Sequence, residues 1–202
     1  MDLVDSLVKN NWLKTPGIIR AFKKIKRKDF MPQDIKVLSE VDEPMPIGKG
    51  QTISQPLTVA FMMEKLSPKK GDKILDVGSG SGWTTAILAS IVGSKGRVIA
   101  MEIIPELKEF GEGNVSKYGF IEKGTVKFIL GDGSRGYKEE APYDRILVSA
   151  AAKKMPAHLK KQLKTGGKMV VPVGNSIIVV VKKTESEFEE KEYEGFSFVP
   201  LV

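Results

Sequence analysis

The sequence predicts a doubly wound α/β fold with a mostly parallel sheet, and three features of the chain indicate it. Short aliphatic stretches alternate with helical ones from residue 72 onward, which is the order of strand–helix–strand units. One of them, "KILDV", runs directly into a glycine-rich loop that opens a helix. The last aliphatic stretches have no helices between them, so we expect antiparallel strands near the C-terminus.

Each element is assigned from its periodicity and its flanking residues. "PGIIRAFKKI", residues 16–25, spaces its apolar side chains by three and four positions, which predicts a helix. Further helices are expected over 56–66, 83–93, 105–119 and 156–167, the last stopping at a Gly-Gly pair. Strands are expected over 72–78, 96–102, 125–132, 143–151, 168–174, 177–184 and 196–202. The pair "NS", 175–176, suits a tight turn between two of these strands.

The chain is expected to form a single domain, 1–202, because this length suits one α/β core. Residues 1–70 would supply N-terminal helices and a substrate loop, and residues 71–202 the α/β core. In the loop "IGKGQTISQP", residues 47–56, Ser54 has two compatible roles. It can cap the helix that follows, and it can hold a substrate, since first-turn amides of a helix are natural partners for an anion.

Composition narrows the classes of function. The chain has no cysteine and one histidine, His158, so thiol chemistry, disulfides and a histidine-rich metal site are excluded, and we expect no metal. It has neither an apolar run of membrane-spanning length nor a signal-like N-terminus. We therefore expect a soluble, cytoplasmic protein without a membrane partner. A monomer is expected as well, although nothing in the composition determines the oligomeric state.

The net charge of +7 raises the question of an anionic partner. The basic excess is concentrated in residues 9–36, whereas residues 185–194 are acidic. No basic segment is interleaved with aromatic residues in the way that suits stacking on bases. A solvated, lysine-rich surface is the favoured interpretation, with no stable nucleic-acid partner, and a nucleic-acid role is kept as a minor alternative.

The segment "KILDVGSGSGWTTA" carries the first functional signal. Gly78, Gly80 and Gly82 follow Asp76 at the end of an expected strand, where α/β proteins bind ligands. A dinucleotide fingerprint would need glycine in place of Trp83, and a phosphate-binding Gly-Lys-Ser/Thr is absent. A carboxylate at Asp76 suits a cationic group better than a pyrophosphate. S-adenosylmethionine, with an ammonium, a sulfonium and no phosphate, is therefore favoured over a nucleotide.

Two further acids end the next two strands. Glu102 lies 20 residues beyond Gly82, where a carboxylate can accept hydrogen bonds from ribose hydroxyls. Asp132 could bond an adenine amino group, and Gly133 would leave room for the ring. Each acid alone is better explained as a cap or turn residue. Three acids at successive strand ends, with a glycine loop after the first, together predict a cofactor site.

With these motifs in view, the chain resembles the protein-L-isoaspartate (D-aspartate) O-methyltransferase family from about residue 15 onward. The pair "GQTISQP" and "FVPL" is specific, whereas the glycine loop marks only the broad methyltransferase class. Other matching segments are "PGIIRAFKKIKRKDFMP", "GDGSRG", "APYDRILVSAAAKKMP" and "LKTGGKMVVPVG". The resemblance implies a Rossmann-like S-adenosylmethionine-dependent methyltransferase sheet with an N-terminal helical extension.

The resemblance also implies an activity and a set of site residues. The family methylates the free carboxylate of L-isoaspartyl residues in damaged proteins and peptides and releases S-adenosyl-L-homocysteine. The ester then closes to a succinimide, which hydrolyses partly to aspartyl. Ser54 would be the catalytic-site serine, orienting the substrate carboxylate. The other substrate-binding residues would be Gln51, Thr52, Ile53, Ala150, Ala151, Ala152 and Val199. The cofactor-binding residues would be Asp76, Gly78, Ser79, Gly80, Glu102, Asp132 and Gly133.

The chemistry is consistent with the near absence of histidine. A carboxylate acceptor is already ionised at neutral pH, so methyl transfer needs alignment and exclusion of water rather than a general base.

Alternatives remain open at this stage. They are methyl transfer to RNA or to a biosynthetic peptide, a binding module without catalysis, and a hydrolase with a Ser54–His158 dyad. For the hydrolase, no acid partner or nucleophile elbow is present.

Three residues also have two possible roles each. Lys153 and Lys154 either favour acidic substrates or are solvated surface, and Trp83 either packs at a helix start or contacts substrate.

Overall fold

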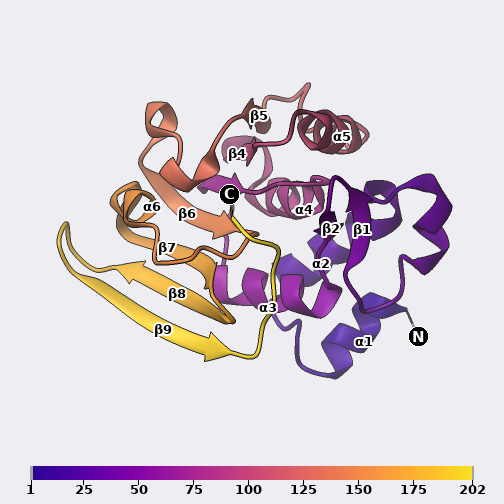
Figure 1. Cartoon of the computed structure of the whole chain (residues 1–202), viewed down its shortest axis with the longest axis horizontal. Helices are drawn as coiled ribbons and strands as arrows, with labels where there is room; N and C mark the ends of the chain where they lie inside the picture. Colours follow the sequence, from indigo (N-terminus) through magenta and orange to yellow (C-terminus); the bar gives the residue numbers. More distant parts are fainter. Residues whose placement is uncertain (1, 202) are drawn as a thin grey trace.

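The structure is a computed structural model that describes residues 2–201. Its seven-stranded sheet has the order β5-β4-β3-β6-β7-β8-β9 (Figure 1). Strands β3 to β7 run parallel, and β8 and β9 are antiparallel to their neighbours. The strands are β3 Lys73–Val77, β4 Arg97–Glu102, β5 Val126–Leu130, β6 Tyr143–Val148, β7 Leu163–Val173, β8 Ser176–Lys182 and β9 Phe188–Glu194. The predicted fold class is confirmed.

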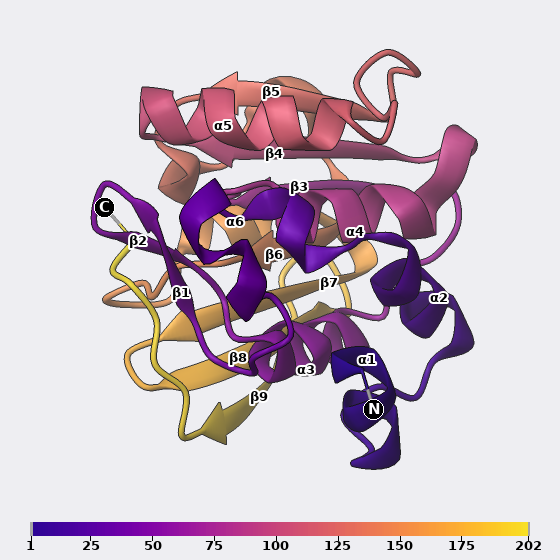
Figure 2. The same cartoon turned by 90° about the vertical axis from the view of Figure 1, so that its right-hand side faces the viewer.

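The helices cover both faces of this sheet, with most of them on one side (Figure 2). They are α1 Leu3–Lys9, α2 Pro16–Lys24, α3 Pro56–Leu66, α4 Trp83–Val92, α5 Pro105–Ser116 and α6 Ala157–Lys161. Helices α3, α4 and α5 lie against one face, and α2 packs outside α4. Alternate residues of the central strands enter two separate buried clusters, one on each face, because successive side chains of a strand point to opposite sides.

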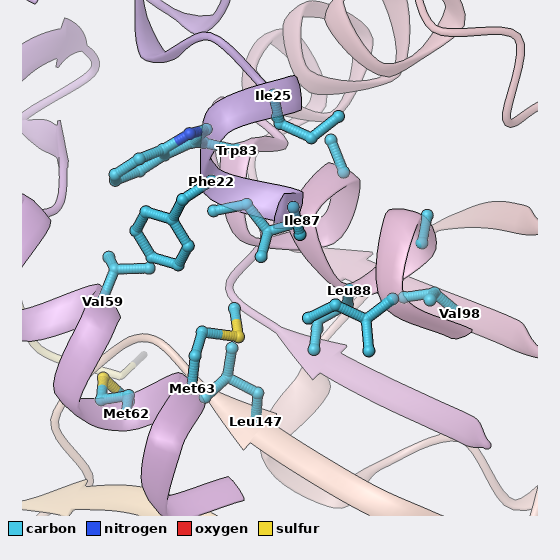
Figure 3. Close-up of a cluster of buried hydrophobic side chains, with 14 of the residues drawn as sticks. Phe22, Ile25, Val59, Met62, Met63, Trp83, Ile87, Leu88, Val98 and Leu147 are labelled. Atoms are coloured by element: carbon cyan, nitrogen blue, oxygen red, sulfur yellow. The ribbon is translucent and has the colours of Figure 1, made fainter. Parts of the chain in front are cut away.

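The larger cluster joins the N-terminal helices to the sheet (Figure 3). Phe22 of α2 meets the ring of Trp83 edge-on, with 5.8 Å between ring centroids. Met63 of α3, Ile87 of α4 and Leu147 of β6 fill the space beneath them and are fully buried. The first residues of the chain are thus packed into the same core as the sheet.

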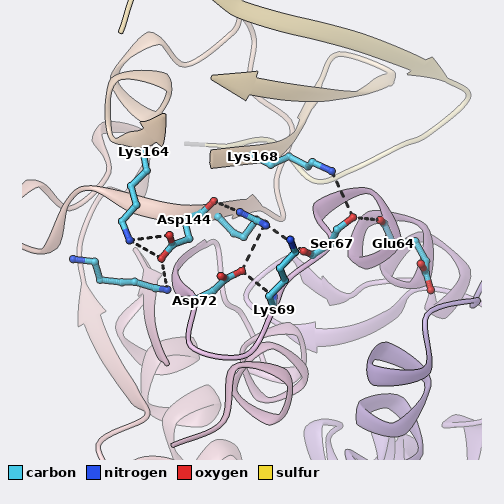
Figure 4. A network of polar contacts seen from close by, with 9 residues as sticks. Glu64, Ser67, Lys69, Asp72, Asp144, Lys164 and Lys168 are labelled. Carbon is cyan, nitrogen blue, oxygen red and sulfur yellow. Dashed lines mark hydrogen bonds and ion pairs between the residues drawn. The ribbon is translucent and has the colours of Figure 1, made fainter. Parts of the chain in front are cut away.

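A network of polar contacts closes the end of the sheet at which β3 begins (Figure 4). The Asp144 carboxylate accepts hydrogen bonds from Lys164 Nζ at 2.8 and 2.9 Å. The Arg145 guanidinium donates to the carbonyls of Ser67 and Asp144 and pairs with Asp72 at 3.7 Å. These contacts tie the starts of β3, β6 and β7 together.

The helix predicted over 156–167 is wrong in its second half. Helix α6 ends at Lys161, and β7 begins at Leu163. The pairing of β6 with β7 shifts register after Tyr143. Gly166 has φ +78°, and a Cβ on Gly167 would meet the Lys164 carbonyl oxygen at 2.7 Å. The Gly-Gly pair therefore shapes an irregularity inside the strand rather than a helix stop.

The last strand and the turn between β7 and β8 also differ from the prediction. The edge strand is the acidic β9, paired along its length with β8, while residues 196–201 contain only an isolated bridge between Pro200 and Ala151. Charged side chains suit an edge strand because they discourage pairing with other chains. The β7–β8 turn is Gly174–Asn175, one residue before the predicted pair, since Val173 faces Ser176.

Residues 47–56 contain a hairpin rather than a simple loop. It is formed by β1 Met45–Gly48 and β2 Gln51–Ile53. Lys49 and Gly50 make the turn, and both have positive φ. Positive φ at both turn residues matches the right-handed twist of the strands. Within residues 2–201, no helix has the length and hydrophobicity needed to cross a bilayer.

Two glycines of α5 differ sharply in what surrounds them. A Cβ on Gly111 would meet the Gly80 carbonyl oxygen at 2.5 Å, whereas a Cβ on Gly113 would meet nothing within 4 Å. Gly111 therefore lets the helix touch the glycine loop, and Gly113 has no such function.

We predict opposite effects for alanine at these two positions. Gly111→Ala should destabilise the fold by about 1–3 kcal/mol or more, because the loop must move. Gly113→Ala should stabilise it by about 0.5–1 kcal/mol through helix propensity. Chemical denaturation of both variants tests this, and a destabilised Gly113→Ala protein would contradict it.

Candidate active site

A glycine loop, residues 78–82, connects the carboxyl end of β3 to the start of α4. Gly78, Gly80 and Gly82 all have positive φ, which side chains rarely adopt. A Cβ on Gly82 would meet the Gly111 carbonyl oxygen at 2.7 Å. The amides of Gly78 and Ser79 both donate to the Met101 carbonyl. The loop is thus held between β4 and α5.

This loop forms the floor of a cavity whose space, counted together with the solvent at its mouth, is about 790 Å³. The other walls come from the hairpin, from the segment after β4, from the segment after β6 and from the C-terminal segment, which crosses the carboxyl ends of the central strands (Figure 1). The predicted site residues that line it are Gln51, Thr52, Ile53, Ser54, Gly78, Ser79, Gly80, Glu102, Gly133, Ala150 and Val199.

Glu102 is the residue that holds two walls of the cavity together. Its Oε2 accepts a hydrogen bond from the Gly80 amide at 2.9 Å. Its Oε1 accepts from the amides of Ile103 and Ile104 at 2.9 and 3.0 Å. The residue is 6% exposed and lies on the cavity wall. A carboxylate has about four lone-pair sites, so these three bonds leave capacity for a ligand hydroxyl.

Asp76 lies behind the glycine loop rather than on the cavity wall. It is fully buried, and its Oδ2 accepts hydrogen bonds from the Thr84 and Thr85 hydroxyls at 3.0 and 2.6 Å. Its Oδ1 has no partner in the described part of the chain. Burial raises the pKa of Asp76 to about 6, although the bonds from Thr85 and Thr84 oppose the shift. The two threonines were missed as partners in the sequence, where "TT" has no distinctive spacing.

Gly133 and Asp132 take different positions at the end of β5. Gly133 lines the cavity, and a Cβ there would meet the Val77 side chain at 2.6 Å. Asp132 is exposed and does not line it. Its Oδ1 accepts from the Ser134 amide at 2.9 Å, and hydrogen bonding from Ser134 holds the pKa of Asp132 below its ordinary value. In this structure Asp132 acts as a turn residue.

Ser54 lines the cavity, but it does not cap α3. The N-cap position is Gln55, which makes no side-chain capping bond. The carboxylate of Asp42 accepts from the Leu57 amide instead, at 2.8 Å. The capping role expected for Ser54 is therefore wrong, because an acid from an earlier segment already occupies the helix N-terminus. The first-turn amide at Leu57 is not free to hold a substrate anion.

The "SAAA" segment after β6 is only partly open to the cavity. Ala150 lines it. Ala151 donates its amide to the Val199 carbonyl and accepts from the Leu201 amide, both at 2.8 Å. Ala152 pairs in the same way with residues of β7 and its turn. Ala151 thus anchors the C-terminal segment and brings Val199 to the cavity wall, while Ala152 joins the segment after β6 to β7.

Trp83, for which the sequence left two roles open, and two residues that carried no recognisable signal also line the cavity. Trp83 lines the cavity and is only 3% exposed, so packing at the helix start and cavity contact occur together. Its Nε1 has no hydrogen-bond partner among the described residues. Ile103 and Leu107 line the wall beyond Glu102. Lys153, Lys154 and His158 are exposed and do not line the cavity.

Comparison with known proteins agrees with this architecture. The family model described as Protein-L-isoaspartate(D-aspartate) O-methyltransferase matches residues 1–202. The chain belongs to this family. A relative of the same name from Methanopyrus kandleri is 44% identical, covering 99% of this chain and 89% of its own length. A second, from Archaeoglobus fulgidus, is 46% identical over 91% of this chain and 84% of its own length.

Solved structures of the family share the fold. A putative Plasmodium falciparum protein-L-isoaspartate O-methyltransferase, solved with S-adenosyl-L-homocysteine, superposes with a TM-score of 0.90. The match covers 99% of this chain and 96% of that one at 23% identity, so it carries the fold alone. A protein-L-isoaspartate O-methyltransferase at 28% identity gives a TM-score of 0.86. That match covers 98% of this chain and 64% of the other.

We predict that Asp76 makes the ligand-free protein less stable as the pH rises. Its pKa is about 6 when folded and 3.8 in its ordinary state. Between these values the folded state binds more protons than the unfolded state, so stability falls with rising pH. The loss should approach roughly 3 kcal/mol by neutral pH.

Chemical denaturation between pH 3.5 and 7.5 measures this loss. Asp76→Asn is the reference, because it cannot ionise. The free energy of unfolding of the wild-type protein, relative to that of the variant, should fall as the pH rises across this range. A difference that is independent of pH would contradict the prediction.

Proposed function

We propose that the protein transfers the methyl group of S-adenosyl-L-methionine to the free carboxylate of L-isoaspartyl residues in damaged proteins and peptides. The family match over residues 1–202 supports this activity. The main observation is that a single cavity is bordered by the predicted cofactor motif and by the two segments that make the family resemblance specific. The glycine loop borders it on one side, and "QTIS" with "VPL" borders it on the other.

The residues around the glycine loop fit the cofactor. Ser79 Oγ and Asp76 Oδ1 are buried polar atoms without partners in residues 2–201, as expected of groups that serve a ligand directly or through water. Gly133 lines the same cavity, and a side chain there would clash with Val77. Ser79, Gly133 and Glu102, which line the cavity, would hold S-adenosylmethionine, with Asp76 buried behind the glycine loop. When bound, the cofactor supplies an electrophilic methyl group and leaves as S-adenosyl-L-homocysteine.

The chain's own part in the reaction is binding and alignment. In our proposal, the Ser54 hydroxyl donates a hydrogen bond to one oxygen of the isoaspartyl carboxylate and leaves the other free to attack. Thr52 and Val199 flank this position from the hairpin and the C-terminal segment. The carboxylate is ionised at neutral pH, so no side chain has to remove a proton. Exclusion of water by these walls strengthens the attack.

Repair would follow without further help from the enzyme. The backbone nitrogen after the methylated residue attacks the ester carbonyl, methanol leaves, and a succinimide forms. Water then opens the ring partly to normal aspartyl. A cytoplasmic location, a monomeric state and a single domain over 1–202 stay predictions.

Matched peptides test the proposal. Labelled S-adenosylmethionine is incubated with the protein and with peptides that differ only in isoaspartyl or aspartyl at one position. Label should enter the isoaspartyl peptide alone. Equal labelling of both peptides, or of neither, would reject the proposal, and transfer to RNA would favour a different acceptor.

Ser54→Ala should lower kcat/KM for the isoaspartyl peptide by about 10- to 100-fold, because a hydrogen bond to a charged group is lost. Binding of S-adenosylhomocysteine, measured by calorimetry, should change little. Ser94→Ala is the control, since Ser94 is exposed in the short 3-10 helix Gly93–Lys95 between α4 and β4. Unchanged turnover by Ser54→Ala would remove the serine from the mechanism.

A further inference from the structure

Arg27 is a buried cation next to the acceptor side of the cavity. It lies in a short 3-10 helix, Arg27–Phe30, and is 5% exposed. Its Nη1 donates to the Val41 carbonyl at 2.9 Å and to the Ser39 carbonyl at 3.4 Å. Its Nη2 donates to the Glu43 carbonyl at 2.7 Å and to the Ser54 carbonyl at 3.3 Å. One guanidinium thus donates hydrogen bonds to four backbone carbonyls from two segments, residues 39–43 and Ser54.

The two segments that accept hydrogen bonds from Arg27 make few other contacts of this kind. Ser54 lies between the end of β2 and the start of α3, in neither element. Residues 39–43 join the second 3-10 helix to β1 and are held mainly through Asp42, which caps α3 and accepts from the Gln55 side chain. Arg27 is therefore the contact that connects the backbone of Ser54 directly to residues 39–43.

Arg27 also touches the cofactor side of the cavity. Its guanidinium carbon lies 5.6 Å from the centre of the Trp83 ring, and Trp83 begins α4 and lines the cavity. Planar guanidinium groups stack favourably on aromatic faces. Phe22 meets the same ring (Figure 3). Arg27 thus bridges the loop that carries Ser54 and the helix that follows the glycine loop.

The charge of Arg27 is balanced by dipoles rather than by an ion pair. Among the described residues, no carboxylate lies within 4 Å of the guanidinium. Burial lowers the pKa of Arg27 to about 10, and the charges of Asp42 and Glu40 oppose this shift. The group therefore stays cationic at neutral pH. A buried cation without a contacting carboxylate is costly for a fold, so a role beyond packing is expected.

We infer that Arg27 is a positioning residue for methyl transfer, fixing the Ser54 backbone against Trp83 so that the Ser54 hydroxyl meets the acceptor carboxylate. This inference rests on the proposed function. Lysine cannot replace the planar guanidinium of Arg27. Its single ammonium group does not hold donors in fixed directions and so does not reach carbonyls on two segments at once. Loss of the guanidinium should shift the Ser54 backbone while the Ser54 hydroxyl itself is still present.

Two variants test the inference, with a third as the control. Arg27→Met removes the charge and the bonds, and Arg27→Lys keeps the charge. Arg145→Met removes another largely buried guanidinium, which donates to carbonyls at the end of the sheet where β3 begins. All three should unfold at lower denaturant concentration than wild type. Steady-state kinetics with the isoaspartyl peptide and calorimetry with S-adenosylhomocysteine are measured on each folded protein.

Both Arg27 variants should lose about 10- to 100-fold in kcat/KM, since small misplacements of reacting groups have large effects on rate. Their affinity for S-adenosylhomocysteine should stay near that of wild type, and Arg145→Met should keep both parameters. If Arg27→Met does not fold, Arg27→Lys alone decides the outcome.

Arg27 variants that lose stability but keep the kcat/KM of Arg145→Met would overturn the inference. Arg27 variants that lose cofactor affinity in parallel with turnover would also overturn it, because the effect would then lie on the glycine loop. Wild-type protein that fails to methylate the isoaspartyl peptide would instead reject the proposed function on which the inference rests.

Discussion

The three amide bonds to the Glu102 carboxylate are the constraint on which the site depends. They join the glycine loop to the segment that leads into α5, so two of the cavity walls are set by one side chain. The close approach of Gly111 to Gly80 completes this junction from the helix side. Because a side chain at Gly111 would clash with the Gly80 carbonyl, the helix and the loop keep a close fit, and the space between β3 and β4 has a defined shape. The open carboxyl ends of a parallel sheet thereby become a specific pocket.

The sequence predicted the parts of the fold whose signal is local. The bounds of α3 match the prediction, and β3 to β6 follow from aliphatic runs, which in β3 and β4 are buried on both faces. Strand β9 was not predicted because five of its seven residues are charged. Its half-buried positions are only Phe188 and Tyr193, which is too few for a periodic pattern. The Gly-Gly pair at 166–167 looks locally like the end of a helix, but pairing with β6 makes these residues part of β7.

The site was predictable to a similar extent. Glycines and strand-end acids have a recognisable spacing, so most of the predicted residues line the cavity. Asp42 and Arg27 act on Leu57 and Ser54 from 15 and 27 positions away. No periodicity links such distant residues, and therefore only the folded backbone reveals them. Likewise, the exposed position of Asp132 depends on the turn that follows β5, which sequence spacing does not define.

The pocket also draws on residues that are far apart in the order of synthesis. Ser54 belongs to the first third of the chain, whereas Val199 is held by Ala151 only after residues 199–201 have joined the protein. The acceptor side of the cavity therefore depends on a segment that lies outside the seven-stranded sheet and is held to Ala151 by backbone hydrogen bonds. The cofactor side needs no residue of this segment to keep its own contacts, so the two sides of one cavity differ in how they are held.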